Sequence, residues 1–549
     1  GQKLGYEYNF LGEVAAITSL DDSRVDFSFA HLKGQKTSVT DINGNVTQYG
    51  RDDFGNTVFT KSPDSGLSTY EFDPAGQLVK KTSASGNSVA YTYDLQRKVS
   101  SVSLADQTLK LSWDKNKPLT AGSEHWQYNP EGKIDTFIRT LAKQTYTTRN
   151  HYNDEGRLEE KTLPDGQTLV YDYSERGQLA GIYRKDFIGK TTLIRASNDE
   201  DASIDLDSKD IKHAIKYEYG NDLTTTYQYK AGELAQIKVD GLFDYRYLYN
   251  NDDRIIGINA GEKALYRYRY DEKGRLDFAL TPSALYGYQY DANGNRTKKI
   301  VNGEHMDYDY GATSNQLTQI QYQKQTYGIE LTADGSMEKA ANFRFEYNKN
   351  DLISKVYLEG ILIASYGYNS KAERISKTTY EANGTSNTKQ YLYDNNKVVA
   401  EINQQGEITR QYIYSGTRLV SLLHGTNVYA IHTNHLGAPI ALTNEDGIKI
   451  WQADYAPFGL AQINEDPDSD GVKFAFNLRL PGQYEDKETG LYYNYYRYYD
   501  PSSGRYISSD PLGLAASMNT YAYVDNDPVQ YVDPLGLILF AFDGTNNTD

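Results

Sequence analysis

A short tyrosine-rich unit recurs along most of this chain, and it constrains the fold more than any other feature of the sequence. A typical copy has aromatic residues at alternating positions, then an Asp or Asn, and a Gly three residues after that. The copies are spaced by about 20 residues, a period typical of solenoids and arrays. Clear copies are Tyr70–Asp73 with Gly76, Tyr152–Asp154 with Gly156, Tyr171–Tyr173 with Gly177, Tyr268–Asp271 with Gly274, and Tyr288–Asp291 with Gly294.

Each unit has the local chemistry of a β-hairpin. Side chains two residues apart lie on the same face of a strand, so the tyrosines of one unit form a single aromatic face. The Asp/Asn-x-x-Gly turn supplies residues that tolerate a positive φ, and pairs such as Arg157–Leu158 begin the returning strand. One hairpin cannot bury its aromatic face alone, so the repeats predict stacked hairpins in one continuous sheet. The competing interpretation is an unrelated β-sandwich that happens to be rich in tyrosine.

Composition extends the all-β prediction over the whole chain. The 549 residues include 51 Tyr and 45 Gly but only 14 Pro, which are spread evenly, so we expect no proline-rich linker. The formal charge of −17 would repel phosphates, so we expect neither nucleic acid nor an anionic membrane as a partner. The absence of Cys excludes disulfides and thiolate metal sites. The N-terminal residues lack the pattern of a signal peptide, and no apolar run approaches the ~18 residues that a membrane-spanning segment requires. We therefore expect a soluble fragment of a longer protein.

Near the C-terminus the pentapeptide Asp-Pro-Leu-Gly-Leu occurs twice, at Asp510–Leu514 and at Asp533–Leu537. Two carboxylates that share one proton can hydrolyse a peptide bond, because one activates water while the other polarises the carbonyl group. Residues 515–532 suffice for an outgoing and a returning strand, which would bring Asp510 and Asp533 side by side. In the alternative interpretation each pentapeptide forms only a turn, with the Asp capping backbone N–H groups.

The repeat unit resembles the YD repeat of the Rhs family, which is shared with the C components of Tc insecticidal toxins and with the teneurin shell. Four later segments are similar to the Rhs-associated core domain: His432–Pro439, Trp451–Gly459, Arg479–Tyr484 and Gly490–Pro501. The resemblance implies one long β-sheet that spirals into a hollow shell, or cocoon, around a toxic C-terminal domain, with the core closing one end. The domains implied are a YD-repeat shell at 1–430, an autoproteolytic core at 431–537 and the start of the toxin at 538–549.

The resemblance also assigns roles near the C-terminus. It makes Asp510 and Asp533 the catalytic pair of an aspartyl protease that cuts its own chain once, between Leu537 and Ile538. Arg497 matches a position implicated beside the pair, where a guanidinium would hold one carboxylate ionised. From the residues alone, a salt bridge that organises the core is nearly as good an explanation of Arg497.

The function implied is a toxin shell that encapsulates its own cleaved C-terminal effector. It would be made in the cytoplasm of a Gram-negative bacterium and delivered by a type VI-like secretion apparatus, or as part of a Tc-toxin complex, to kill competing bacteria or host cells. Expected partners are a secretion spike or adaptor protein and an immunity protein. Phe540–Asn547 resembles the opening strand of phospholipase-like α/β-hydrolases, which indicates one type of cargo. The alternative function is a non-enzymatic adhesion or carbohydrate-binding protein, in which the tyrosine faces form a ligand platform.

Several other patterns carry no function of their own. Gly189–Thr191 lacks the earlier glycine of a phosphate-binding loop, because Arg184 stands at that position. His432 and His435 have a spacing suited to a metal, but no partner ligand follows them, so we expect them to form hydrogen bonds in the core. We expect no cofactor and no metal. The remaining acids near the pair are interpreted as turn and capping residues: Asp500, Asp525 and Asp527.

Overall fold

The fold is almost entirely β, as the composition predicts. The computed structural model describes residues 4–9, 11–19, 23–29, 35–104, 108–199, 212–369, 371–537 and 540–541. Within these residues the principal sheet has 44 strands, from β1 (Gly5–Tyr8) to β44 (Ala461–Asn464). Each strand pairs antiparallel with the next one in the sequence, so the sheet is a single meander. The described helical segments are two short 3₁₀ turns, η1 (Gly513–Ala515) and η2 (Val524–Asn526).

The tyrosine-Asp unit forms the hairpins that were predicted from it. In one example, β25 (Lys263–Tyr270) and β26 (Leu276–Leu280) are joined by a turn in which the Asp271 carboxylate accepts the backbone N–H groups of Lys273 and Arg275. Gly274 has a φ of +81° in this turn, a conformation that favours glycine. The repeat residues therefore fix the turn through local hydrogen bonds.

The last tyrosine of each unit has a structural role that the sequence pattern did not reveal. The Tyr270 hydroxyl donates a hydrogen bond to the carbonyl oxygen of Ile255, at the start of β24 (Ile255–Ala260), at 2.7 Å. The same bond, at 2.7 to 2.9 Å, recurs along the sheet from Tyr93, Tyr173, Tyr249, Tyr290, Tyr310 and Tyr368. These repeats are thus tied to the hairpin before them by the same hydrogen bond.

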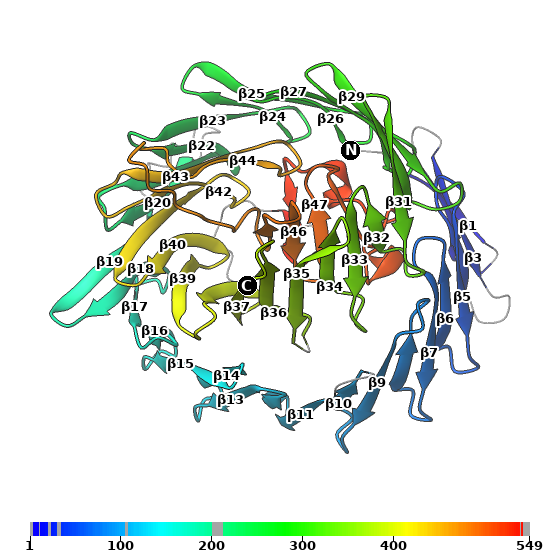
Figure 1. Cartoon of the computed structure of the whole chain (residues 1–549), viewed down its shortest axis with the longest axis horizontal. Helices are drawn as coiled ribbons and strands as arrows, with labels where there is room; N and C mark the ends of the chain where they lie inside the picture. The colour runs from blue at the N-terminus through cyan, green and yellow to red at the C-terminus, as the bar shows by residue number, and fades with distance from the viewer. Residues whose placement is uncertain are drawn as a thin grey trace.

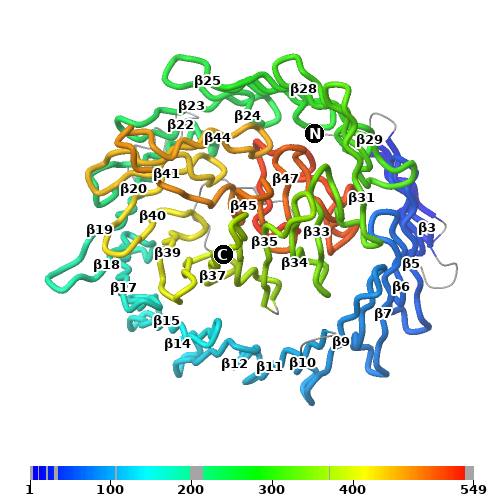
Figure 2. Tube along the Cα trace, in the orientation of Figure 1, coloured from blue at the N-terminus to red at the C-terminus, as the bar shows by residue number. Residues whose placement is uncertain are grey.

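The sheet winds as a spiral whose circuits lie against one another (Figures 1 and 2). Hydrogen bonds join residues of the first circuit to residues 233 to 264 positions later in the chain. Examples are the contacts of Asn43 with Asp291, Ser85 with Asp334, Asn87 with Asp351, Arg139 with Glu373, and Lys161 with Asp394. In the described residues the end strands β1 and β44 pair with β2 (Val14–Thr18) and β43 (Lys449–Tyr455) rather than with each other, so the sheet forms a spiral shell without closing on itself.

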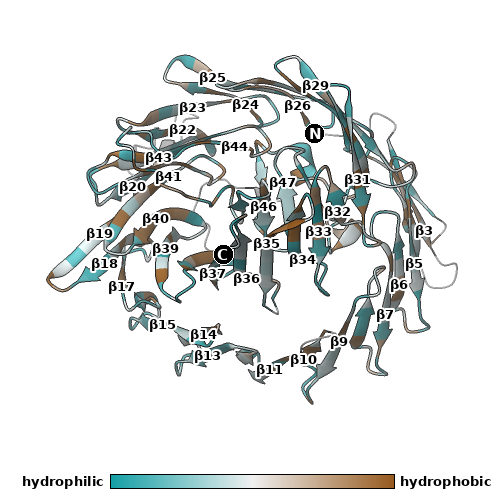
Figure 3. Ribbon diagram, in the orientation of Figure 1, coloured by the Kyte–Doolittle hydropathy of each residue, from teal (hydrophilic) through white to brown (hydrophobic). Residues whose placement is uncertain are grey.

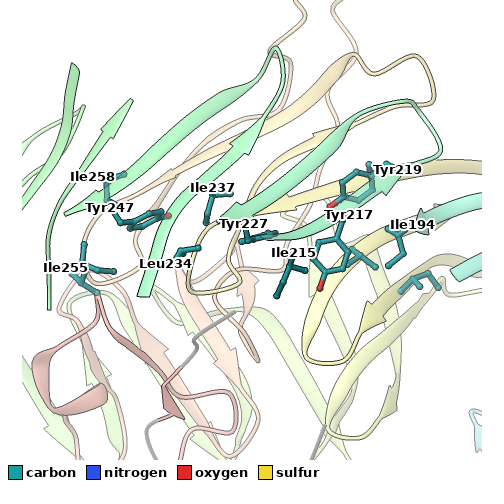
Figure 4. Close-up of a cluster of buried hydrophobic side chains, with 14 of the residues drawn as sticks. Ile194, Ile215, Tyr217, Tyr219, Tyr227, Leu234, Ile237, Tyr247, Ile255 and Ile258 are labelled. Carbon is teal, nitrogen blue, oxygen red and sulfur yellow. The ribbon is translucent and has the colours of Figure 1, made fainter. Parts of the chain in front are cut away.

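Apolar and aromatic side chains are buried where layers of the structure meet. One cluster gathers isoleucine, leucine and tyrosine side chains from successive hairpins, including Ile194, Ile215, Tyr217, Tyr227, Ile237 and Ile258 (Figure 4). Apolar and polar residues alternate along the strands in Figure 3, as expected for a sheet with one face packed. The described residues thus bury their apolar side chains in several clusters rather than in one central core.

A small second sheet lies inside the outline of the shell in Figure 1. It consists of β45 (Tyr484–Asp486), β46 (Leu491–Asn494), β47 (Arg497–Asp500) and β48 (Arg505–Tyr506). Asp486 fastens it to the shell through buried ion pairs with Arg374 and Lys377 of β36 (Arg374–Tyr380). The large sheet continues to Asn464, and β41 (Asn427–Thr433) spans residue 430, so the sheet has no break at the boundary expected there. The division into shell and core stays a prediction.

Among the described residues, no helix is both long enough and apolar enough to cross a membrane.

A buried aspartate pair as the candidate active site

Arg497, Asp510 and Asp533, which the sequence placed in one site, come together in the interior of the core. Arg497 begins β47, Asp510 follows β48, and Asp533 follows β49 (Tyr531–Val532). The Nη2 atom of Arg497 lies 2.8 Å from Oδ2 of Asp510 and 3.3 Å from Oδ2 of Asp533. All three side chains are buried. The group that bridges the two carboxylates is therefore a single guanidinium nitrogen.

Hydrogen-bond donors surround the carboxylate of Asp533. The Tyr506 hydroxyl donates to Oδ2 at 2.7 Å, and the backbone N–H of Leu537 donates to Oδ1 at 3.0 Å. Asn494 donates to the Tyr506 oxygen at 2.8 Å and to the Asp533 carbonyl oxygen at 2.9 Å. Both carboxylate oxygens of Asp533 therefore act as hydrogen-bond acceptors.

Asp510 has a different environment. Its Oδ1 accepts the backbone N–H of Leu512 at 2.8 Å, and its own N–H donates to the carbonyl oxygen of Thr520 at 2.9 Å. Burial raises the pKa of Asp510 to about 6, against the opposing effects of the Arg497 guanidinium and the Leu512 N–H. Asp510 is therefore a carboxyl group that can carry a proton near neutral pH, which is the property a general acid requires.

The residues just before the expected cut are held against the same groups. The carbonyl oxygen of Gly536 accepts a hydrogen bond from Nε of Arg497, and the N–H of Leu537 donates to Asp533. A Cβ atom at Gly536, which has a φ of +69°, would lie 2.5 Å from the carbonyl oxygen of Asn494. Ile538 lies outside the described residues, but β50 (Phe540–Ala541) pairs antiparallel with β49. Phe540 and Ala541 thus pair with the strand that directly precedes Asp533.

Arg497 makes contacts that fit both of the roles that the sequence left open. Besides contacting both carboxylates, it donates to the Thr520 carbonyl oxygen through Nη1 at 3.0 Å. Its guanidinium carbon lies 3.5 Å from the centre of the Tyr506 ring. This one side chain therefore links several segments of the core and places its positive charge against both aspartates.

Sequence reasoning missed Asn494, Tyr506 and Thr520, which hold the aspartates in place. Tyr506 is one of many tyrosines, and nothing in its local sequence distinguishes it from the structural ones. The other nearby acids differ in role. Asp500 accepts the N–H of Ser502, as expected for a turn residue. Asp527 lies buried 3.6 Å from Arg254 of the shell, and burial raises its pKa to about 7.

The two histidines form hydrogen bonds in the interior. His432 contacts the hydroxyl oxygens of Thr225 and Thr443 at 3.1 and 3.0 Å, and burial lowers its pKa to about 3. His435 contacts the carbonyl oxygen of Val529 at 2.9 Å, and burial lowers its pKa to about 4. Among the described residues, a group of acidic side chains that could hold a metal ion is formed by Asp466, Asp468 and Asp470. Their carboxylate oxygens lie within 4.8 Å of one another on a largely exposed loop.

Comparison with known proteins gives matches over most of the chain. The family model described as teneurin YD-shell matches residues 188–529, and the model described as RHS Repeat matches residues 72–109. The chain is 31% identical over 225 residues to a double-stranded DNA deaminase toxin A of Burkholderia cenocepacia, a match that covers 35% of this chain and 15% of that protein. It is 42% identical over 120 residues to the toxin protein Tse5 of Pseudomonas aeruginosa, covering 22% of this chain and 9% of that protein.

A solved structure resembles this one over nearly its whole length. The crystal structure of TcdB2–TccC3 matches with a TM-score of 0.77 at 20% identity, over 98% of this chain and 32% of that one. At this identity the match establishes the fold alone. The chain spans less than a third of that protein and a smaller share of the two toxins.

Proposed function

We propose that this chain, which belongs to the teneurin YD-shell family, is the shell and self-cleaving core of a toxin. In this proposal the spiral sheet encloses a C-terminal effector, and Asp510 and Asp533 cut the chain once, between Leu537 and Ile538. The observation that carries the proposal is the position of one Arg497 nitrogen between two buried carboxylates, one of which accepts the N–H of Leu537.

The proposed reaction is the hydrolysis of one amide bond. Asp533, as the carboxylate, removes a proton from a water molecule, whose oxygen attacks the carbonyl carbon of Leu537. Asp510, as the carboxylic acid, donates its proton to the carbonyl oxygen. Collapse of the tetrahedral intermediate breaks the bond to the Ile538 nitrogen, which takes the proton held by Asp533 and leaves as an amine. A hydroxyl of the intermediate returns a proton to Asp510, and the new carboxyl group of Leu537 then ionises. Because the bond belongs to the same chain, the reaction is intramolecular and runs once per molecule.

The names of the relatives support a toxin-delivery role. One is a deaminase toxin and another is a toxin protein, and in each the matched segment is a small part of the whole. We therefore place the effector beyond Leu537 and the shell before it. A deaminase cargo now has as much support as the phospholipase-like hydrolase indicated by Phe540–Asn547, most of which lies outside the described residues. Delivery from a Gram-negative cytoplasm by a type VI-like apparatus or in a Tc-type complex, with a spike or adaptor and an immunity protein, completes the proposal.

Packing of the tyrosines favours the shell over an adhesion platform. Side chains such as Tyr217, Tyr227 and Tyr391 are fully buried, and the tyrosine hydroxyls at the ends of the repeats bond to backbone carbonyl groups of the same sheet. A ligand platform needs exposed aromatic faces. The tyrosine pattern is thus used to build the sheet.

The test uses the full-length chain with its toxin domain. Wild-type protein should yield two fragments, the smaller beginning at Ile538, whereas Asp510→Asn or Asp533→Asn should slow cleavage by a factor on the order of 10² to 10⁴. Asp500→Asn is the matched control, because the Asp500 carboxylate accepts the backbone N–H of Ser502, in the same turn, and belongs to neither pentapeptide. Cleavage of both site variants at the wild-type rate would overturn the assignment. Co-elution of the two fragments on a native sizing column should accompany cleavage, and complete separation would contradict encapsulation.

A further inference from the structure

Thr520 is the point at which the shell reaches the candidate active site. Its carbonyl oxygen accepts the N–H of Asp510 at 2.9 Å and Nη1 of Arg497 at 3.0 Å. The position of this one backbone group therefore affects the first aspartate and the bridging arginine together. Its hydroxyl points elsewhere, toward a residue far away in the sequence.

That residue is Asp64, on the turn between β6 (Thr57–Ser62) and β7 (Gly66–Phe72) in the first circuit of the shell. The Thr520 hydroxyl donates to Oδ2 of Asp64 at 2.7 Å, across 456 residues of sequence. The Tyr521 hydroxyl donates to the carbonyl oxygen of Asp64 at 3.1 Å. Only 2% of Asp64 is exposed to solvent. A buried carboxylate of the shell thus supports the segment that supports Asp510 and Arg497.

The second circuit fixes Asp64 from the other side. The backbone N–H of Asn315 donates to Oδ1 of Asp64 at 2.7 Å, and the side-chain amide of Asn315 donates to Oδ2 at 3.0 Å. Gln316 donates to the Asp64 carbonyl oxygen at 2.8 Å. Figure 1 shows β6 and β7 of the first circuit near β31 (Gln325–Leu331) of the second. The three parts that must come together around Asp64 are therefore the first circuit, the second circuit and the core.

We propose that Asp64 is a positioning residue for self-cleavage, and that the core cuts the chain only after the first circuit has docked on it. This inference rests on the proposed aspartyl protease. Without Asp64 the Thr520 hydroxyl and the Asn315 amide lose their buried acceptor, so the Thr520 segment is free to shift. A displacement of about 1 Å in a reacting group can cost on the order of 10²-fold in rate. The toxin is then not released from a shell that is only half wound.

The experiment follows fragment release over time during cell-free synthesis of the full-length chain. Asp64→Ala should slow cleavage at least ~10-fold, and Thr520→Val, which removes the hydroxyl that binds Asp64 and Ser509, should do the same. Thr520→Ser keeps the hydroxyl and should cut at a rate near that of the wild type. The effects of the two changes should combine to much less than their product in the double variant, because both changes remove the hydrogen bond between Thr520 and Asp64.

Asp41 supplies the matched control. It is also a buried aspartate on a first-circuit turn, between β4 (Lys36–Thr40) and β5 (Val46–Arg51). It accepts the side-chain amide of Asn293 in the second circuit at 2.8 Å, so Asp41→Ala removes a similar bond between the circuits. The melting temperatures of both alanine variants should fall by similar amounts, while only Asp64→Ala loses cleavage.

Equal cleavage rates for Asp64→Ala and Asp41→Ala, or a wild-type rate for Thr520→Val, would refute the positioning role. Asp510→Asn in the same series separates this inference from the one on which it rests. If Asp510→Asn is cut normally, the protease assignment itself fails. If Asp510→Asn stays intact and Asp64→Ala is cut normally, only the role of Asp64 fails.

Discussion

The two Asp-Pro-Leu-Gly-Leu segments have the same sequence but different structures. In the first, Oδ1 of Asp510 accepts the N–H of Leu512, two residues later, and the chain continues into η1 with Leu512 49% exposed. In the second, Oδ1 of Asp533 accepts the N–H of Leu537, four residues later. Both aspartates contact Arg497, but the first segment ends in a turn at the surface, whereas in the second the backbone carbonyl of Gly536 also binds Arg497.

The difference follows from the partners of each segment. The first is fixed through Thr520, which also contacts the shell. The second is fixed by Asn494, Tyr506 and Arg497, all of which belong to the small core sheet. We infer a division of labour in which the first segment supplies the acid, while the second supplies both the base and the bond that is cut. The predictions below test whether the two segments are as different in energy as they are in structure.

The largest difference is expected between the two glycines. Both have a positive φ, of +57° at Gly513 and +69° at Gly536, so alanine is strained at either position by about 1–2 kcal/mol. A Cβ atom at Gly513 meets nothing within 4 Å, whereas at Gly536 it would lie 2.5 Å from the Asn494 carbonyl oxygen. Gly536→Ala should therefore reduce cleavage to background, while Gly513→Ala should retain most of it. Time courses of fragment release measure both, and equal loss in the two variants would mean that the segments are equivalent.

The pH dependence of the cleavage rate should report the protonation of Asp510 in the first segment. Folding raises the pKa of Asp510 from 3.8 to about 6, so the group's contribution to stability is fully present below its unfolded value and is lost as pH rises through about 6. If Asp510 acts as the acid, each pH unit above its pKa should slow cleavage about tenfold, or about 100-fold by roughly pH 8. Single-turnover rates measured across this range on freshly refolded chain would show the decline. A rate that rises above pH 6 would exchange the roles of the two aspartates.

A smaller effect is expected at the second segment from Tyr506→Phe. This change removes the hydroxyl that donates to Asp533 and leaves the ring beside Arg497. We expect cleavage to slow on the order of 10-fold, with a loss of about 1–3 kcal/mol in stability because Asn494 also loses a partner. The control for stability is Tyr492→Phe. Tyr492 is a core tyrosine whose hydroxyl accepts the N–H of Ala461. Equal cleavage rates in the two variants would show that the Tyr506 hydroxyl has no role in cleavage.

Much of the site could be anticipated because its sequence signal is local and duplicated. The pentapeptides identified Asp510 and Asp533, and the motif around Arg497 pointed to the third residue. Tyr506 and Asn494 could not be found in this way, since their importance comes from contacts across the core rather than from any pattern around them. Asp64 had no signal at all, because its partner Thr520 lies 456 residues away.

The fold was predicted for a similar reason, and its limits are also physical. The sequence by itself determined that the chain forms antiparallel hairpins, since alternating tyrosines and Asp/Asn-x-x-Gly turns act over a few residues and do not depend on the rest of the molecule. Only the tertiary structure decided where the circuits of the spiral meet and which residue of the shell supports Thr520. Those contacts depend on the twist accumulated over 44 strands, which no single repeat encodes.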